Sequence, residues 1–156
     1  NTYKIKKIDK LTLSNKKVKY ENGDKIPNGE GVYLFVVNAD YSNFDIDYFN
    51  RELTGLFMKN GYFYTKTVGV PPIINNTNKF EKDKIFYVGT GEKVVSRIKE
   101  HWTSNKITQT TSLNLGFESR AEIKDYLDIY IIDDININRQ QLEKDIRKVY
   151  GSYFGE

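Results

Sequence analysis

The feature that most constrains this chain is an apolar run at residues 31–37, Gly31-Val32-Tyr33-Leu34-Phe35-Val36-Val37. A short run of this kind that follows a turn signal, here Pro27-Asn28-Gly29, is typical of a strand buried in the core. A second run, Ile85-Phe86-Tyr87-Val88-Gly89, predicts another strand that ends at its glycine, and Asp128–Asp134 predicts a third. We therefore expect a sheet at the centre of the fold.

Three segments of the second half predict helices that cover this sheet. One starts at about Glu92, one opens at a capping box, Ser119-Arg120-Ala121-Glu122, and the last is capped by Asn138. The apolar positions recur at helical spacing: Val94, Val95, Ile98 and Trp102, then Ile123, Tyr126 and Leu127, then Leu142, Ile146, Val149 and Tyr150. This order of elements predicts an α+β fold.

The length of 156 residues suits one domain, residues 1–156. Alternating residues in Tyr3–Lys6 and Leu11–Leu13 predict short strands within a basic N-terminal segment, residues 1–30. Residues 38–84 look like an elaboration of the core, with a helix at the spacing of Ile46, Phe49 and Leu53, a strand at 62–68 and then a loop. The many aromatic residues of this elaboration either pack its helix on its strand or face DNA.

The charge is modest overall, +3, but residues 1–30 hold eight lysines against four acidic residues. This basic segment either contacts a phosphate backbone or is ordinary exposed surface. The chain has no cysteine and one histidine, which excludes a disulfide framework, a thiolate site and a zinc centre with several histidines. No apolar run approaches the roughly 18 residues of a membrane span, and we expect a cytoplasmic protein without a membrane partner.

Two groups of charged residues are candidates for chemistry. Lys93, Arg97 and His101 fall at i, i+4 and i+8 of the first predicted helix, next to a glycine turn at Gly89 and Gly91. A cationic stripe there suits an anionic substrate such as a phosphodiester, and the alternative is a solvated helix face. Glu143, on the last helix, has Arg139 and Arg147 at i−4 and i+4, so its alternative is a surface ion-pair ladder.

These residues resemble the motifs of the GIY-YIG nuclease family. Gly31-Val32-Tyr33 and Tyr87-Val88-Gly89 are similar to its two signature tripeptides, each with Val in the place of Ile. The family follows its second tripeptide with a helix that bears an essential arginine and commonly a histidine four residues later, as Arg97 and His101 stand here. A later helix carries a metal-binding glutamate, which Glu143 matches. The resemblance covers about residues 29–37 and 84–150.

The resemblance implies a small central antiparallel sheet flanked by helices, with an inserted helix and strand at 38–84. It implies an endonuclease that hydrolyses DNA phosphodiester bonds with Mg²⁺ or Mn²⁺, possessing a restriction or phage-defence role by analogy. In that reading Tyr33 is the general base, Tyr87 orients water or phosphate, Arg97 stabilises the transition state, His101 shares a proton or contacts phosphate, and Glu143 holds the metal. Gly89, Lys93 and Lys84 would lie at the substrate.

Two departures from the family pattern are visible. Tyr33 and Tyr87 are 54 positions apart, whereas family members usually join these strands by a short hairpin, and residues 151–156 lack the asparagine that many members carry after the last helix. A non-catalytic nucleic-acid-binding module of the same fold and an RNA-directed nuclease are the alternative functions. One active site per chain would need a homodimer, or two successive events, to cut both strands.

Overall fold

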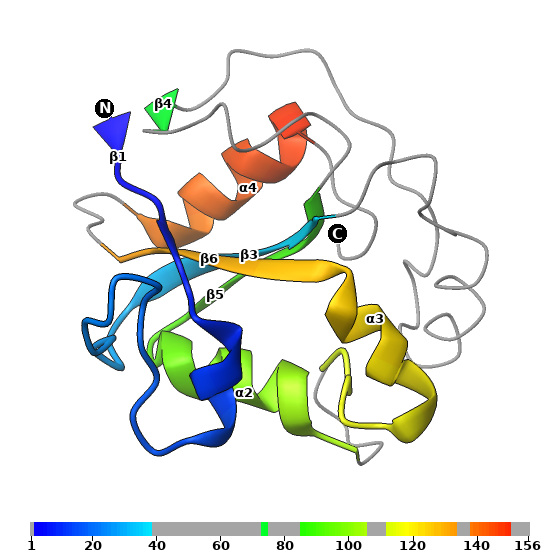
Figure 1. Cartoon of the computed structure of the whole chain (residues 1–156). Coiled ribbons are helices and arrows are strands. Elements are labelled where there is room, and N and C mark those ends of the chain that lie inside the picture. Colours follow the sequence, from blue (N-terminus) through cyan, green and yellow to red (C-terminus); the bar gives the residue numbers. More distant parts are fainter. Residues whose placement is uncertain (1, 39–72, 75–84, 106–111, 134–137, 151–156) are drawn as a thin grey trace.

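A four-stranded antiparallel sheet forms the centre of the computed structural model, which describes residues 2–38, 73–74, 85–105, 112–133 and 138–150 (Figure 1). Its strands are β2 (Lys6–Lys7), β3 (Gly31–Val37), β5 (Ile85–Gly91) and β6 (Leu127–Ile132), in the order β2-β6-β3-β5. β3 is paired on both sides, and all of its residues are buried. The predicted buried strand is thereby confirmed.

Helices cover the two faces of the sheet. Helix α2 (Val94–Thr103) lies on one face, and α4 (Arg139–Tyr150) lies on the other (Figure 1). Alternate residues of β3 enter the two cores, because successive side chains of a strand point to opposite faces. Tyr33 and Phe35 join the core beneath α2, and Leu34 joins the core beneath α4. The fold is therefore α+β, as the sequence predicts.

The two long helices bury the faces that their sequences predict. Val94, Val95, Ile98 and Trp102 are buried on α2, and Leu142 and Ile146 are buried on α4. The side chains of Val149 and Tyr150 lie outside the described part of the chain. The Asn138 side chain caps α4, since its Oδ1 accepts the backbone N–H of Gln140 at 2.9 Å and of Gln141 at 3.3 Å.

The capping box predicted at Ser119–Glu122 is wrong. The short helix α3 (Ala121–Asp125) instead continues a 3-10 turn, η4 (Glu118–Arg120), with no side-chain cap bond, and Leu127 belongs to β6. The physical reason is that a hydrogen bond of a buried side chain holds this turn. Arg120 is buried, and its Nη1 donates to the carbonyl oxygen of Leu113 at 2.9 Å.

The N-terminal segment also differs from its prediction. Leu11–Leu13 lies in a 3-10 helix, η1 (Lys10–Ser14), because the Asp9 side chain and carbonyl accept the N–H groups of Leu11 and Thr12. The strands of this segment are instead β2 and β1 (Thr2–Tyr3). β1 pairs in parallel with β4 (Ile73–Ile74), which the sequence predicts as a loop. The helix and strand expected in the insertion lie outside the described residues.

Several lysines of the basic segment make internal contacts. Lys10 Nζ donates to the carbonyl oxygens of Leu127 at 2.8 Å and of Lys124 at 3.2 Å. Lys7 pairs with Glu21 at 3.3 Å. Lysines 4, 16, 17, 19 and 25 are exposed, so these five are the candidates for the predicted contact with a phosphate backbone. None of the helices in the described ranges is long and apolar enough to cross a membrane.

Candidate active site

Tyr33 lies at the centre of the sheet, on the face that α2 covers, and it is only 1% exposed. In the β3–β5 register it stands opposite Gly89. A Cβ added at Gly89 would lie 2.3 Å from the Tyr33 Oη and 2.5 Å from its Cζ, far closer than atoms can approach. Gly89 therefore makes room for the Tyr33 ring. β5 continues past Gly89, its predicted end, because Gly91 still pairs with Gly31.

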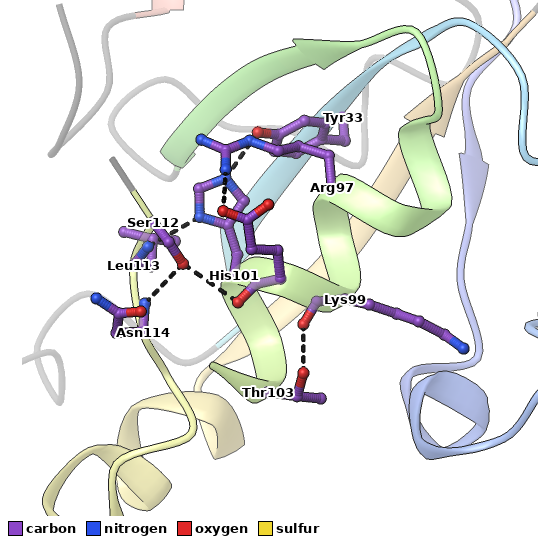
Figure 2. A network of polar contacts seen from close by, with 9 residues as sticks. Tyr33, Arg97, Lys99, His101, Thr103, Ser112, Leu113 and Asn114 are labelled. Atoms are coloured by element: carbon purple, nitrogen blue, oxygen red, sulfur yellow. Dashed lines mark hydrogen bonds and ion pairs between the residues drawn. The ribbon is translucent and has the colours of Figure 1, made fainter. Parts of the chain in front are cut away.

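His101 contacts Tyr33 from the helix above. Its Nε2 lies 2.8 Å from the Tyr33 Oη, and its Nδ1 accepts the backbone N–H of Leu113 at 2.9 Å (Figure 2). The side chain is fully buried. Burial, with a smaller effect from the nearby charge of Arg97, lowers the pKa of His101 well below its usual range. The imidazole is therefore neutral at physiological pH.

Arg97 points toward the same cluster from one turn earlier in α2 (Figure 2). It is partly buried, and its Nη1 forms an ion pair with Glu100 Oε1 at 2.8 Å. The pKa of Arg97 is raised, because the surrounding acidic groups, Tyr33 first among them, outweigh the effect of burial. Arg97 thus provides a fixed positive charge at the rim of a buried site.

The predicted cationic stripe is therefore wrong as a description of one helix face. Lys93 is exposed and precedes α2, Arg97 is partly buried, and His101 is buried and neutral. The reason is that each step of four residues turns the side chain by about 40° around the helix, so the three positions pass from the exposed side at Lys93 to the buried face at His101. Lys84, the other predicted substrate contact, lies outside the described residues.

Tyr87 completes the aromatic side of the cluster. Its ring centroid is 5.1 Å from that of His101 and 6.3 Å from that of Tyr33. Burial raises the pKa of Tyr87, and the charges of Arg97 and Arg147 partly oppose this. Burial likewise raises the pKa of Tyr33, helped by Tyr87 and by the charge of Glu143, while Arg97 lowers it through its charge and a hydrogen bond. The expected lowering by nearby cations is present but is outweighed by burial.

Glu143 lies in the opposite layer, where it is partly buried. It is on α4, where its Oε1 accepts from Arg147 Nη2 at 2.9 Å, and the same Nη2 donates to the carbonyl oxygen of Val88 on the edge strand β5 at 2.6 Å. Its negative charge raises the pKa values of Tyr33 and Tyr87, so it lies within electrostatic range of both phenols. Of the two ion pairs that the spacing of α4 allows, the Glu143–Arg147 pair is present. Arg139 pairs with Glu30 instead, at 2.7 Å.

Three contacts of the site were not predicted. Glu100 holds Arg97, the Leu113 N–H holds His101, and Arg147 links Glu143 to β5. The i, i+3 spacing of Arg97 and Glu100 is a signal that could have been used. The Leu113 contact has no such signal, because it comes from a backbone group twelve residues beyond His101.

The chain was compared with known proteins at three levels. No family model, no curated protein and no solved structure matches it.

Proposed function

We propose that the protein is a metal-dependent endonuclease of the GIY-YIG type that hydrolyses DNA phosphodiester bonds. The observation that carries the proposal is that candidate residues far apart in the sequence lie together in the fold. Tyr33, Tyr87, Arg97 and His101 come from two strands and one helix, and they meet in one cluster at the sheet, in which Tyr33 and His101 are buried and Tyr87 and Arg97 are partly buried. The resemblance to the family motifs selected these residues from the sequence, so their meeting in space is a further support.

Arg97 is the residue suited to the phosphate. A guanidinium can bind two non-bridging oxygens at once and stabilise the charge that grows on them in the transition state. Its ion pair with Glu100 fixes one nitrogen and orients the plane of the group. Lys93, exposed just before α2, can add a second and less fixed positive charge.

Glu143 fits a hard divalent cation. Mg²⁺ prefers oxygen ligands and usually takes one or two carboxylates, with water and phosphate oxygens filling the other positions. Oε1 of Glu143 is bound to Arg147, and Oε2 makes no hydrogen bond to another described residue. The described residues contain no group of three or more His, Asp or Glu side chains that could hold a metal. When bound, Mg²⁺ or Mn²⁺ supplies Lewis-acid polarisation of a phosphate oxygen and a water of lowered pKa.

Tyr33 is suited to move the proton in this reaction. The oxygen of a water forms a bond to phosphorus while one bridging P–O bond breaks, and the proton of the water passes to the Tyr33 phenolate oxygen. The leaving alkoxide takes a proton from solvent. Arg97, hydrogen-bonded to Tyr33, stabilises the phenolate form, and Tyr87 lies beside it to orient water or phosphate.

One observation favours the non-catalytic binding module. Burial raises the pKa of Tyr33, and a protonated phenol cannot accept a proton. The same cluster could then bind a phosphate through Arg97 without cleaving it. An RNA substrate is the third alternative, since nothing in the cluster selects against a 2′-hydroxyl. A restriction or phage-defence role, and a homodimer for double-strand cleavage, belong to the same proposal.

The test is cleavage of supercoiled plasmid with Mg²⁺ by the wild type and by Tyr33→Phe, Arg97→Ala and Glu143→Ala. Lys99→Ala is the matched control on α2, because its Nζ contacts only the Asn15 carbonyl at 2.7 Å among described residues. We expect the wild type and the control to nick the plasmid and the three site variants to lose at least about 100-fold in rate. Cleavage that the variants retain would contradict the site, binding of DNA without cleavage would favour the module, and cleavage of RNA alone would favour the third alternative.

A further inference from the structure

The last turn of α2 is held by a short buried segment, residues 112–116. The Leu115 N–H donates to the His101 carbonyl at 2.8 Å, and the Gly116 N–H donates to the Ser104 carbonyl at 2.9 Å. The Ser112 hydroxyl donates to the Glu100 carbonyl at 3.2 Å (Figure 2). The first two bonds satisfy carbonyl groups that the end of a helix leaves without partners, and the third is a second bond to a carbonyl that already accepts the Ser104 N–H. Segment 112–116 is therefore docked on the helix turn that carries His101.

Segment 112–116 is also held by a buried side chain, that of Arg120. Arg120, buried beneath it, donates from Nη1 to the Leu113 carbonyl at 2.9 Å and to the Asn114 carbonyl at 3.4 Å. Asn114 has a φ of +50°, in the left-handed region, which asparagine adopts more readily than most residues other than glycine. A Cβ added at Gly116 would lie 2.1 Å from the Thr103 carbonyl oxygen, so the backbone approaches α2 as closely as it can.

The contact of Leu113 with His101 decides where the imidazole proton lies. A backbone N–H can only donate, so the Nδ1 that accepts it at 2.9 Å carries no hydrogen. The neutral ring must then carry its hydrogen on Nε2. Nε2 is the atom that lies 2.8 Å from the Tyr33 Oη, so in that bond His101 donates and the phenol oxygen accepts.

We propose that the Leu113 N–H is a positioning group that fixes His101 as the hydrogen-bond donor to Tyr33, so that His101 is not the base that removes the Tyr33 proton. The phenol hydrogen then points away from His101. In the phenolate form, reached when that hydrogen passes to solvent, the oxygen accepts N–H bonds from both His101 and Arg97. The part of this inference that concerns reaction rate rests on the proposed function, and the part that concerns the tautomer does not.

The direct experiment is a ¹H–¹⁵N correlation spectrum of the imidazole nitrogens in the wild-type protein at neutral pH. His101 is the single histidine, so its two ring nitrogens are the only ones in the spectrum. We expect one protonated nitrogen, Nε2, and an unprotonated Nδ1. A hydrogen on Nδ1, or on both nitrogens, would overturn the proposal, whether or not the protein cleaves DNA.

A variant pair tests whether segment 112–116 sets the tautomer. Gly116→Ala places a methyl group against the Thr103 carbonyl and should push the segment off α2, while Gly29→Ala, with nothing within 4 Å of its new Cβ, is the matched control. We expect a mixture of tautomers, or faster exchange of the Nε2 hydrogen, in Gly116→Ala alone. A spectrum of Gly116→Ala identical to that of the wild type would overturn the positioning role of Leu113.

A second pair tests the donor role through the rate. His101→Gln keeps an N–H that can reach the Tyr33 oxygen, and His101→Leu does not. If the wild type cleaves DNA, we expect His101→Gln to be roughly tenfold or more faster than His101→Leu, as a hydrogen bond to a charged oxygen predicts. Equal rates in the two variants would contradict the donor role. A correct tautomer in a protein that cleaves nothing would instead contradict the proposed function alone.

Discussion

The two faces of the sheet bury different kinds of side chain. Beneath α4 the core is apolar, and its polar pair, Glu143 and Arg147, stands at the β5 edge. Beneath α2 the same sheet buries the Tyr33 hydroxyl and the His101 ring, and Arg120, Ser112 and Asn114 are buried around them. Both faces belong to one set of strands, so the difference comes from the alternate residues that each face receives.

The face of the sheet beneath α2 needs more side chains and backbone groups at fixed positions than the apolar face beneath α4. A buried polar group costs free energy unless it is hydrogen-bonded, so each polar atom beneath α2 needs a partner at a fixed position. His101 takes one partner from β3 and one from segment 112–116. The apolar face needs only side chains of the right volume. We infer that the polar core beneath α2, together with Glu143 at the β5 edge, serves chemistry and that the apolar core beneath α4 serves stability, and the predictions below can break that division.

The largest expected effect is that of Tyr33→Phe on cleavage. Removing the phenol oxygen removes the proposed base, which typically contributes 10²–10⁴-fold in rate. The matched control is Tyr130→Phe, since Tyr130 is buried on the α4 face. Plasmid-nicking rates should fall by about that factor in the first variant and stay near wild type in the second. Equal rates in the two would show that the faces do not divide chemistry from packing.

Next comes Ile132→Ala, a cavity variant on the apolar face. Ile132 is fully buried under α4, so its truncation should lower the free energy of unfolding by about 2–5 kcal/mol. Urea denaturation measures this loss. The cleavage rate per folded molecule should stay close to that of the wild type, and a selective loss of rate would contradict the division.

Gly89→Ala should act on the polar face through geometry alone. The new methyl group would occupy the space of the Tyr33 hydroxyl, so the ring must move by an ångström or so. Such a displacement of a reacting group can cost about 100-fold in rate. Gly29→Ala, which adds its methyl in open space, should leave the rate unchanged. A fully active Gly89→Ala would argue against Tyr33 as the reacting residue.

The smallest effect concerns pH and stability. The folded protein holds His101 neutral with a lowered pKa, whereas in the unfolded chain this pKa is near 6.5, so below that pH the unfolded state binds more protons. The stability is therefore complete above about pH 6.5 and falls as pH drops toward the folded pKa, by at most about 1.4 kcal/mol per pH unit. Urea midpoints between about pH 7 and 5 measure the slope, and His101→Gln should flatten it relative to the wild type. An equal slope in both proteins would mean that His101 is protonated in the fold.

The sequence was sufficient for the apolar elements and for the motif residues. Gly31–Val37 is fully buried as predicted, because a run that is apolar on both sides fits only a covered central strand. Tyr33, Arg97 and His101 were named from the resemblance to the family motifs, Arg97 and His101 also from their helical spacing, and in the structure they lie together. Spacing could not predict how far these side chains are buried or which of them are charged. The burial of His101 depends on how α2 packs on the sheet, and the partner of its Nδ1 is a backbone N–H from residue 113.

The errors have the same origin. Leu11–Leu13 alternates like a strand, yet local capture of its N–H groups by Asp9 makes a 3-10 helix. Ser119–Glu122 has the letters of a capping box, yet the inward bonds of Arg120 decide the turn. In both cases a specific hydrogen bond, local at Asp9 and from a buried side chain at Arg120, outweighs the pattern of residue types.

The central claim is that Glu143, from the α4 layer, belongs to the same site as the residues beneath α2. Its most direct test is the Mg²⁺-dependent rate of plasmid nicking by Glu143→Gln, with Asp145→Asn as the control on the same helix, since Asp145 accepts only from Gln141 at 2.8 Å among described residues. We predict that Glu143→Gln loses at least about 100-fold in rate at every Mg²⁺ concentration, while Asp145→Asn keeps wild-type activity. A Glu143→Gln protein that is folded and as active as the wild type would contradict the account.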